Sequence, residues 1–448
     1  MNNIFKIENG TLLDVIDKDV KEVTIPDGVT AIGDEAFARC KSLTSIIIPD
    51  GVTTIGDYAF ARCYSLANVT IGNSVTSIGD FAFEWCTSLV NATIPDGVTN
   101  IGNGVFVNCT SLTSVTIPYS VTTIGGHTFY NCRSLTNITI PNSVTDVGNE
   151  AFARCNSLSS VTIPDGVTAI GDDAFYDCTS LTNVIIPDSV ASIGNGAFQD
   201  CGLLTSVTIG NNVTTIGDYV FCDCTSLTSV IIPNSITTIG DYAFRGCTSL
   251  TSVIIPENVT NIGNHVFAWC ESLTSITIPD SVTTIGHDAF CACLSLASIT
   301  IGNGVTTIGN YAFYRCASLT NITIPDSVTT IGIGVFQDCS SLTSATSNYK
   351  AFKIMPNGDI ACRDYKFTPN KWTNTESDIS LCHKGYHFCT NLFEIFNYYC
   401  GELDKNIAIY ECEVGDEVIQ RDTSKCATNR IKPVKRLYKA DVIKLLNV

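Results

Sequence analysis

The sequence is poor in charged residues, and above all in positive ones. Only 15% of its 448 residues are charged, and 25 basic residues stand against 43 acidic ones, so the formal net charge is −18. A nucleic-acid partner is not expected, because basic side chains would be needed to neutralise the phosphates. Hydrophobic residues make up 45% of the chain, which also excludes a largely disordered protein.

Long hydrophobic runs are missing too. No segment approaches the roughly 20 apolar residues that cross a bilayer. The first ten residues contain no apolar stretch of the kind found in secretory signals. We therefore expect no membrane partner and a location in the cytoplasm. Cysteine, in contrast, is abundant, with 22 residues.

Most of these cysteines follow a strict 23-residue period. Fourteen of them lie 23 residues apart, from Cys40 to Cys339, and each has Phe three residues before it and Leu three residues after it. A glycine keeps its own phase from Gly33 to Gly332. Such recurrence is typical of a repeat solenoid, in which each coil packs only against its neighbours. The sequence therefore predicts fourteen coils that share one continuous core.

Residues 43–63 indicate how one coil folds. Ile46 and Ile48 alternate with outward residues, which predicts a strand with one face toward the core. Pro49 ends the strand because it has no N–H to donate to the next coil. The segment 59–63 is expected to return to the core through a short helical turn. Stacking of such coils would place the strands in a parallel sheet.

The pattern Gly-Asp-x-Ala-Phe-x-x-Cys-x-x-Leu at residues 56–66 resembles the unit of the BspA-type leucine-rich repeat, which also has 23 residues. The resemblance extends over about residues 21–344. It implies a mostly β, right-handed solenoid with a parallel sheet and short helical turns. Some members of that family are surface adhesins, whereas the missing signal sequence favours the cytoplasm for this chain.

The cysteine ladder is interpreted as part of the core. Each ladder cysteine shares its phase with Phe and Leu, and a buried thiol behaves as a small hydrophobic group. Disulfides or metal ions between neighbouring coils are the alternatives. Cys222 and Cys291 lie outside the period, two residues before a ladder cysteine, and are expected at the surface.

Differences between coils identify a candidate binding edge around each Phe–Cys segment. The outward strand positions are nearly constant Ser, Asn, Thr or Ile, so the strand face is expected to be chemically plain. Two residues before Phe and one before Cys, however, Tyr, Trp, His and Arg recur. These residue types dominate interface hot spots. The alternative is that the residues are merely exposed and unconstrained, which would also let them vary between coils. The predicted partner-binding residues are Tyr58, Arg62, Trp85, Tyr242 and Trp269.

The two ends depart from the repeat. Residues 1–20 are predicted to form an N-terminal cap, a hairpin that turns at Asn9-Gly10. Residues 345–448 are predicted to form a separate small α+β domain, because the repeat stops and the last 100 residues hold 15 basic and 13 acidic groups. Strands are expected at 349–355 and 407–414, and helices at 391–399 and 439–447.

The C-terminal segment contains the densest chemistry of the chain. Its pattern Cys-x-x-Gly-Tyr-His-Phe-Cys resembles an uncharacterised domain of phage and bacterial proteins, which implies no activity. A zinc site is an alternative, but its four ligands would lie within eight residues and would strain a tetrahedral site. The ligands of that site would be Cys382, His383, His387 and Cys389.

The same segment is similar to part of the poly-ADP-ribose-polymerase-type transferase fold. That resemblance implies that His387 and Tyr398 would sandwich nicotinamide, with a third element at 410–415. The chain departs from the pattern, because the first ring is His instead of Tyr and no Glu occurs between 422 and 448.

Two functional hypotheses follow. The first is a non-enzymatic protein-interaction scaffold without a cofactor. Its solenoid would bind or present a macromolecular partner, which we expect to be a protein. The alternative is an enzyme whose ADP-ribosyltransferase-like C-terminal domain is targeted by the solenoid. No nucleophile–base pair is repeated or singled out in the solenoid, so we expect any catalysis to reside beyond residue 344.

Overall fold

The computed structural model describes residues 4–346 and five strands between residues 373 and 437, with side-chain environments for residues 4–343. The chain divides into two compact units, Met1–Asn258 and Val259–Val448, which are described separately. The repeats form a mostly β, parallel solenoid of about fourteen turns, and the described residues contain no helix. The predicted domain boundaries at residues 20 and 344 stay predictions.

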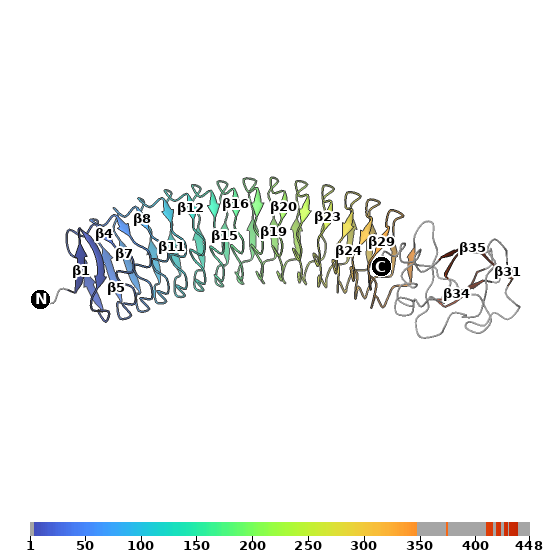
Figure 1. The fold of residues 1–448 in the computed structure, drawn as a ribbon, viewed down its shortest axis with the longest axis horizontal. Coiled ribbons are helices and arrows are strands. Elements are labelled where there is room, and N and C mark those ends of the chain that lie inside the picture. The colour runs from blue at the N-terminus through green and yellow to red at the C-terminus, as the bar shows by residue number, and fades with distance from the viewer. Residues whose placement is uncertain are drawn as a thin grey trace. The chain divides into compact units, whose positions relative to one another are not determined.

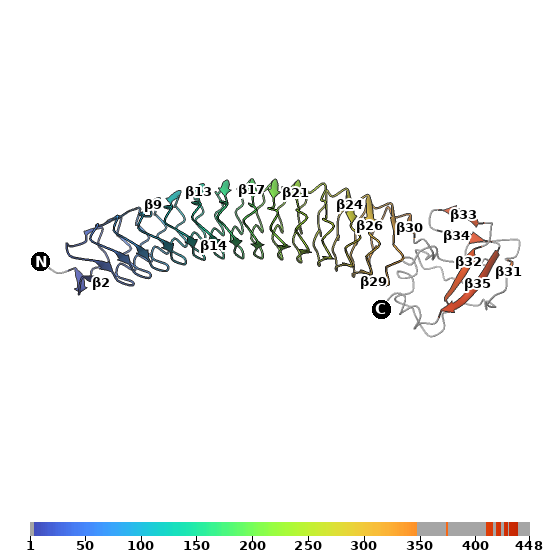
Figure 2. The same cartoon turned by 90° about the horizontal axis from the view of Figure 1, so that it is seen from above.

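Most coils contribute two strands, which we call the long strand and the short strand; residues 252–254, at a long-strand position, form no strand. Figure 1 shows short strands such as β8, β12 and β16 following one another along one edge, and Figure 2 shows β9, β13 and β17 along another side of the coils. In the first unit the long strands are β3 (Glu22–Thr24), β5 (Ser45–Ile48), β7 (Asn68–Ile71), β9 (Asn91–Thr93), β11 (Ser114–Thr116), β13 (Asn137–Thr139), β15 (Ser160–Thr162), β17 (Asn183–Ile185), β19 (Ser206–Thr208) and β21 (Ser229–Ile231). The short strands are β4 (Ala31–Ile32), β6 (Thr54–Ile55), β8 (Ser77–Ile78), β10 (Asn100–Ile101), β12 (Thr123–Ile124), β14 (Asp146–Val147), β16 (Ala169–Ile170), β18 (Ser192–Ile193), β20 (Thr215–Ile216) and β22 (Thr238–Ile239).

The second unit repeats the same plan. Its long strands are β24 (Ser275–Ile278), β26 (Ser298–Ile301), β28 (Asn321–Thr323) and β30 (Ser344–Thr346), and its short strands are β23 (Asn261–Ile262), β25 (Thr284–Ile285), β27 (Thr307–Ile308) and β29 (Thr330–Ile331). The C-terminal strands are β31 (Thr373–Asn374), β32 (Ile409–Val414), β33 (Val418–Asp422), β34 (Lys425–Thr428) and β35 (Arg430–Leu437).

Pairing is parallel and in register with the repeat. Ser45 faces Asn68 and Thr54 faces Ser77, each pair 23 residues apart. Because the register equals the period, each side chain lies beside its counterpart in the next coil. Equivalent residues therefore form columns along the solenoid.

The hairpin predicted from Asn9-Gly10 is present. Strand β1 (Phe5–Glu8) pairs antiparallel with β2 (Thr11–Val15), and Asn9 and Gly10 both have positive φ, as a type I′ turn requires. Strand β2 pairs in parallel with β4, so the hairpin continues the row of short strands.

Columns of Phe, Cys and Leu form the core. The Phe rings stack along the first unit from Phe37 to Phe244, with centroids 4.8–5.7 Å apart, and again in the second unit from Phe267 to Phe336. The thiol of Cys63 donates to the Phe37 carbonyl oxygen at 3.1 Å, and this bond recurs along the ladder. The buried thiol is thus both a hydrophobic filler and a hydrogen-bond donor.

The sixteen cysteines between 40 and 339 are buried, and no disulfide joins them in this described part of the chain. This includes Cys222 and Cys291, which are 2% and 8% exposed. The prediction that these two lie at the surface is wrong. Both directly follow the ladder Phe of their coil, where side chains of adjacent coils cover them: Cys291 packs with Ala268 and Ala292, and Cys222 lies beside Arg245.

In the C-terminal segment, β32 confirms the strand predicted at 407–414 for residues 409–414, and it pairs antiparallel with β35. Strands β33 and β34 form an antiparallel pair. The expected strand at 349–355 and the expected helices at 391–399 and 439–447 lie outside the described residues.

Candidate interaction surface

The segment from two residues before each ladder Phe to the ladder Cys is a series of turns, not the helical turn that the sequence predicts. In the first coil the N–H groups of Glu35, Phe37 and Arg39 donate to carbonyls of the next coil at 2.7–2.8 Å. The alternate N–H groups, those of Ala38 and Cys40, close turns within the coil at 2.8 and 3.1 Å. This alternation pairs N–H and C=O groups of neighbouring coils with one another. A helix would instead pair these groups within a single coil.

We call this side of the solenoid the turn face and divide it into three columns. The first column is the residue two before each ladder Phe, the middle column is the residue after Phe, and the third column is the residue before the ladder Cys. All positions of the first and third columns have positive φ, including the glycines at 104, 196, 246 and 334. The backbone of this face therefore favours Gly, Asn or Asp in two columns of every coil.

Many coils nevertheless carry large side chains at these positions. Tyr58, Phe81 and Tyr219 have φ of 54°, 55° and 59°, and Trp85 and Trp269 have φ of 58° and 64°. A left-handed conformation costs a non-glycine residue about 1–2 kcal/mol. Large aromatic residues are thus kept where the backbone disfavours them, which is the pattern expected of side chains selected for their surface.

The structure brings three of the five predicted residues together. Tyr58 stacks on Phe81 of the next coil, with centroids 5.1 Å apart and planes at 10°. Arg62 and Trp85 occupy the third column of the same two coils, and Tyr58 and Trp85 are each 39% exposed. We call Tyr58, Arg62, Phe81 and Trp85 the N-terminal cluster.

A glycine and a glutamate next to this cluster determine its shape and its charge. A Cβ on Gly104 would overlap the Phe81 ring, so the glycine lets the ring lie flat over the following coil. Burial raises the pKa of Glu84, although Arg62 and a hydrogen bond from Trp85 act to lower it. The cluster is therefore an aromatic surface with one guanidinium and one partly shielded carboxyl group.

The other two predicted residues lie elsewhere. Tyr242 stacks on Tyr219 in the first unit, with centroids 4.6 Å apart and planes at 4°. Trp269 belongs to the second unit, is 43% exposed and donates its backbone N–H to the Cys291 carbonyl at 2.7 Å. Both positions belong to the columns that the sequence identified.

The middle column is a feature that sequence reasoning missed. Its Tyr130 and Tyr176 hold the guanidinium of Arg154 between them, with centroid distances of 5.7 and 5.9 Å. Tyr130 also meets the first column, where its ring lies edge-on to that of His127, with centroids 6.0 Å apart. The signal was available, because the residue after Phe varies between coils as strongly as the two columns that were chosen.

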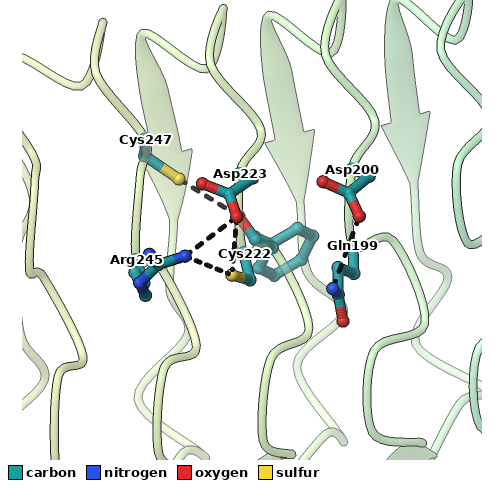
Figure 3. Close-up of polar contacts among 7 residues, drawn as sticks. Gln199, Asp200, Cys222, Asp223, Arg245 and Cys247 are labelled. Carbon is teal, nitrogen blue, oxygen red and sulfur yellow. Dashed lines mark hydrogen bonds and ion pairs between the residues drawn. The ribbon is translucent and has the colours of Figure 1, made fainter.

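Figure 3 shows a second group of this column, built around Cys222. Arg245 Nη1 lies 3.0 Å from Asp223 Oδ2 and 3.9 Å from the Cys222 sulfur, and the thiol donates to the same carboxylate oxygen at 3.4 Å. Burial, and then the Asp223 charge, raise the pKa of Cys222 to about 12. A neutral, buried thiol is not a nucleophile at neutral pH, so this group is structural.

Metal and cofactor candidates find no support in the part of the chain that is described. No group of three or more His, Cys, Asp or Glu residues there is arranged to hold a metal ion. The described residues form no helix, and so none that is long and apolar enough to cross a membrane. The candidates Cys382, His383, His387, Cys389 and Tyr398 lie outside the described residues.

Solved structures resemble this solenoid. A leucine-rich repeat protein from Bacteroides ovatus is 27% identical over 77% of this chain and 97% of its own, with a TM-score of 0.52. A leucine-rich cell surface protein from Faecalibacterium prausnitzii is 29% identical over 78% of this chain and 94% of its own, with a TM-score of 0.46. A leucine-rich repeat protein from Eubacterium ventriosum is 28% identical over 74% of this chain and 88% of its own, with a TM-score of 0.44. The first similarity supports the solenoid fold.

Family comparisons cover nearly the whole chain. The BspA type Leucine rich repeat region matches residues 16–136, 122–250 and 237–357. A domain of unknown function, DUF7666, matches residues 348–445. A search of curated proteins returns no match. The periodic core, the parallel register and these matches together make the chain a member of the BspA-type leucine-rich repeat family, followed by a C-terminal domain of unknown function.

Proposed function

We propose that the chain is a non-enzymatic scaffold that binds a protein partner through its turn face, and that the N-terminal cluster is the centre of the contact. One observation carries the proposal: Tyr58, Phe81 and Trp85 occupy left-handed positions where Gly, Asn or Asp would be less strained. Exposed Trp, Tyr and Arg in one neighbourhood have the composition of a binding hot spot. Membership of a leucine-rich repeat family supports the scaffold role.

The test compares two faces of the full chain. Cross-linking in cells, followed by quantitative mass spectrometry, would identify partners of the native chain and of two double variants. Tyr58→Gly with Trp85→Gly removes the turn-face anchors, and Thr116→Ala with Thr139→Ala is the matched change on the strand face. We expect a partner that is lost only with the turn-face variant. Equal loss with both variants, or loss only with the strand-face variant, would contradict the proposal.

The proposed location is the cytoplasm. Sixteen buried cysteines without a disulfide suit a reducing compartment, where thiols persist. Alkylation in denaturant without reductant, followed by mass spectrometry, should label Cys109 to Cys316 of the protein isolated from its own cells. Disulfides between successive ladder cysteines would argue for an oxidising compartment instead.

A further inference from the structure

The basic residues of the solenoid are few and unevenly placed. Before residue 349 the chain has 10 basic and 30 acidic residues. We extend the turn face by a fourth column, the residue after each ladder Cys. In the third and fourth columns of the first six coils, no residue is acidic and five are basic: Arg39, Lys41, Arg62, Arg133 and Arg154. Half of the basic residues in this part of the chain therefore lie in two columns of one face.

Two of the five basic side chains are bound within the chain. Arg133 donates from Nε to an oxygen of Asn131 at 2.7 Å, and the guanidinium of Arg154 lies between two tyrosine rings. The other three are exposed, and among the described residues their side chains form no ion pair and no hydrogen bond. We call these three residues of the first two coils the basic strip: Arg39, Lys41 and Arg62.

Carboxylates of the first three coils do not pair with the basic strip. Glu35 and Glu84 are the acidic residues of the turn face there, and neither forms an ion pair with it. Burial raises the pKa of Glu84 more than Arg62 lowers it. The carboxylates of Asp34 and Asp57 precede the first column and accept a backbone N–H of the next coil at 2.9 and 2.8 Å. The strip therefore keeps a positive charge without a partner among these groups.

The backbone places like charges of the basic strip side by side. The N–H of Arg39 donates to the Ala61 carbonyl at 2.8 Å, and the corresponding N–H of Arg62 donates to the third coil at 2.7 Å. The two arginines thus occupy equivalent positions in neighbouring coils, about 4.8 Å apart, where like charges destabilise each other. Both also have positive φ, of 64° and 62°. An anionic group that covers the strip would relieve this repulsion.

Aromatic side chains border the basic strip. Tyr64 lies in the same coil as Arg62, and Trp85 lies in the next coil; they are 37% and 39% exposed. Tyr58 also shares the coil of Arg62 and is 39% exposed. From Arg39 to Trp85 there are two coil steps, or about 10 Å, which three residues of an extended peptide span. A short peptide can therefore contact the charge and the aromatic surface at the same time.

From these observations we infer that the turn face binds an acidic peptide segment of its protein partner. The carboxylates of the segment contact the basic strip, and an apolar or aromatic side chain of it packs on the N-terminal cluster. Guanidinium groups suit this ligand because they bind carboxylates through two parallel hydrogen bonds. The inference rests on the proposed function, since it identifies the chemistry of the partner at the same site.

The charge of the same column farther along the solenoid restricts where such a segment can bind. In the seventh to ninth coils the third column carries Asp177, Asp200 and Asp223. Burial, and then the charge of Asp223, raise the pKa of Asp200, so these carboxylates already repel one another. An acidic segment is repelled there and attracted at the first two coils, and such complementarity gives an interface its specificity.

Selection from a phage-displayed library of random 16-residue peptides, with the full chain as bait, tests the inference. We expect the enriched peptides to have at least two more acidic than basic residues, and an apolar side chain about three residues from an acidic one. The most enriched peptide is then synthesised, and its dissociation constant for each variant is measured by fluorescence anisotropy.

Charge reversal on the basic strip is compared with the same reversal elsewhere. The variant with glutamate at all three positions of the strip should bind the peptide at least 100-fold more weakly. The matched variant has Lys6→Glu, Lys21→Glu and Arg315→Glu, which change three exposed basic residues outside the strip. Its net charge is the same, and it should bind less than threefold more weakly than the native chain.

A milder variant separates lost attraction from added repulsion. Glutamine at the three positions of the strip should weaken binding at least tenfold, while the melting temperature does not fall. Between 50 and 500 mM NaCl the affinity of the native chain should fall at least fivefold, because salt screens exposed charges. The affinity of the glutamine variant should fall less than twofold over the same range.

The variant with Tyr58→Gly and Trp85→Gly distinguishes failure of this inference from failure of the proposed function. Peptide binding that is lost both there and in the glutamine variant supports both proposals. Enriched peptides without an acidic excess, or peptides that bind the charge-reversed and native chains equally but are lost with the aromatic variant, would overturn the acidic partner and leave the proposed function. If the selection yields no peptide that either variant weakens, both proposals are wrong.

Discussion

Removal of one ring from the phenylalanine stack tests the core most directly. Phe198 is fully buried, and it stacks on Phe175 and Phe221 at 5.2 and 5.7 Å with planes at 1° and 8°. Phe→Ala changes in cores cost about 3–5 kcal/mol through lost transfer energy and the cavity that is left. The upper part of that range is expected here, because the change removes two aromatic contacts of about 0.5–1.5 kcal/mol each.

The site also has little freedom to collapse. The N–H of Phe175 donates to Ala197 and that of Phe198 donates to Val220, at 2.8 and 2.9 Å, so the backbone holds neighbouring coils at a fixed spacing. We therefore expect Phe198→Ala to lower the free energy of unfolding by about 4–5 kcal/mol, and Phe198→Leu, which keeps most of the volume, by less than about 1.5 kcal/mol.

The assay must allow for repeat architecture. Solenoids unfold in parts, because each coil depends mainly on its neighbours, so urea denaturation is combined with hydrogen exchange followed by mass spectrometry. Protection should fall most in peptides between residues 175 and 221 and least near the N-terminal hairpin. A loss below 1 kcal/mol, or an even loss of protection along the first unit, would show that the ring is not a core residue and would refute the coil assignment.

The buried ladder thiols, the left-handed turn positions and the C-terminal segment can each be tested separately. Burial raises the pKa of Cys155 from 9.0 to about 12. As the pH rises, the unfolded chain therefore loses this proton near pH 9, whereas the folded chain keeps it to about pH 12. The contribution of Cys155 to the free energy of unfolding should be fully present below pH 9 and be lost between about pH 9 and 12. Cys155→Ala should make the free energy of unfolding depend less on pH in this range, and an unchanged dependence would contradict the prediction. At the left-handed position 85, Trp85→Gly should be more stable in thermal unfolding than Trp85→Ala by about 1–2 kcal/mol, whereas the reverse order would show that the position is unstrained. Calorimetry of the full chain with millimolar NAD should show no binding, and binding that is lost in His387→Ala and Tyr398→Ala would support the transferase alternative.

The sequence was sufficient to predict the repeat and its core. Because the period is strict, the environment of Phe60 or Cys63 in one coil is that of its counterparts in all others, and fourteen copies of the pattern identify the inward phases. The hairpin at Asn9-Gly10 could be predicted for a different reason, since few other dipeptides accept two successive positive φ angles.

The turn face was harder to predict because local propensity was misleading. Ala59, Phe60 and Ala61 are compatible with a helical turn, yet each turn here is set by hydrogen bonds to the next coil, which a single coil does not reveal. The glycines at 104 and 246 were the available signal, because they occupy the same columns as Phe81 and Asp223 and indicate a left-handed backbone there. Cys222 and Cys291 were misplaced for the same reason.

The three kinds of column place stability and recognition in different parts of the repeat. Inward columns such as that of Phe198 determine stability, because their side chains contact the coils on both sides. On the strand face the side chains belong to the hydrogen-bonded ladder, as Thr205 and Thr228 do, so few residue types are tolerated and neighbouring coils look alike. On the turn face the backbone alone completes the ladder, so a coil can carry Trp85 or Asn108 in the third column with the same hydrogen bond from its N–H, at 2.8 Å in both. Side chains there can change without loss of the fold, and for this reason we expect specificity for a partner to be encoded on the turn face.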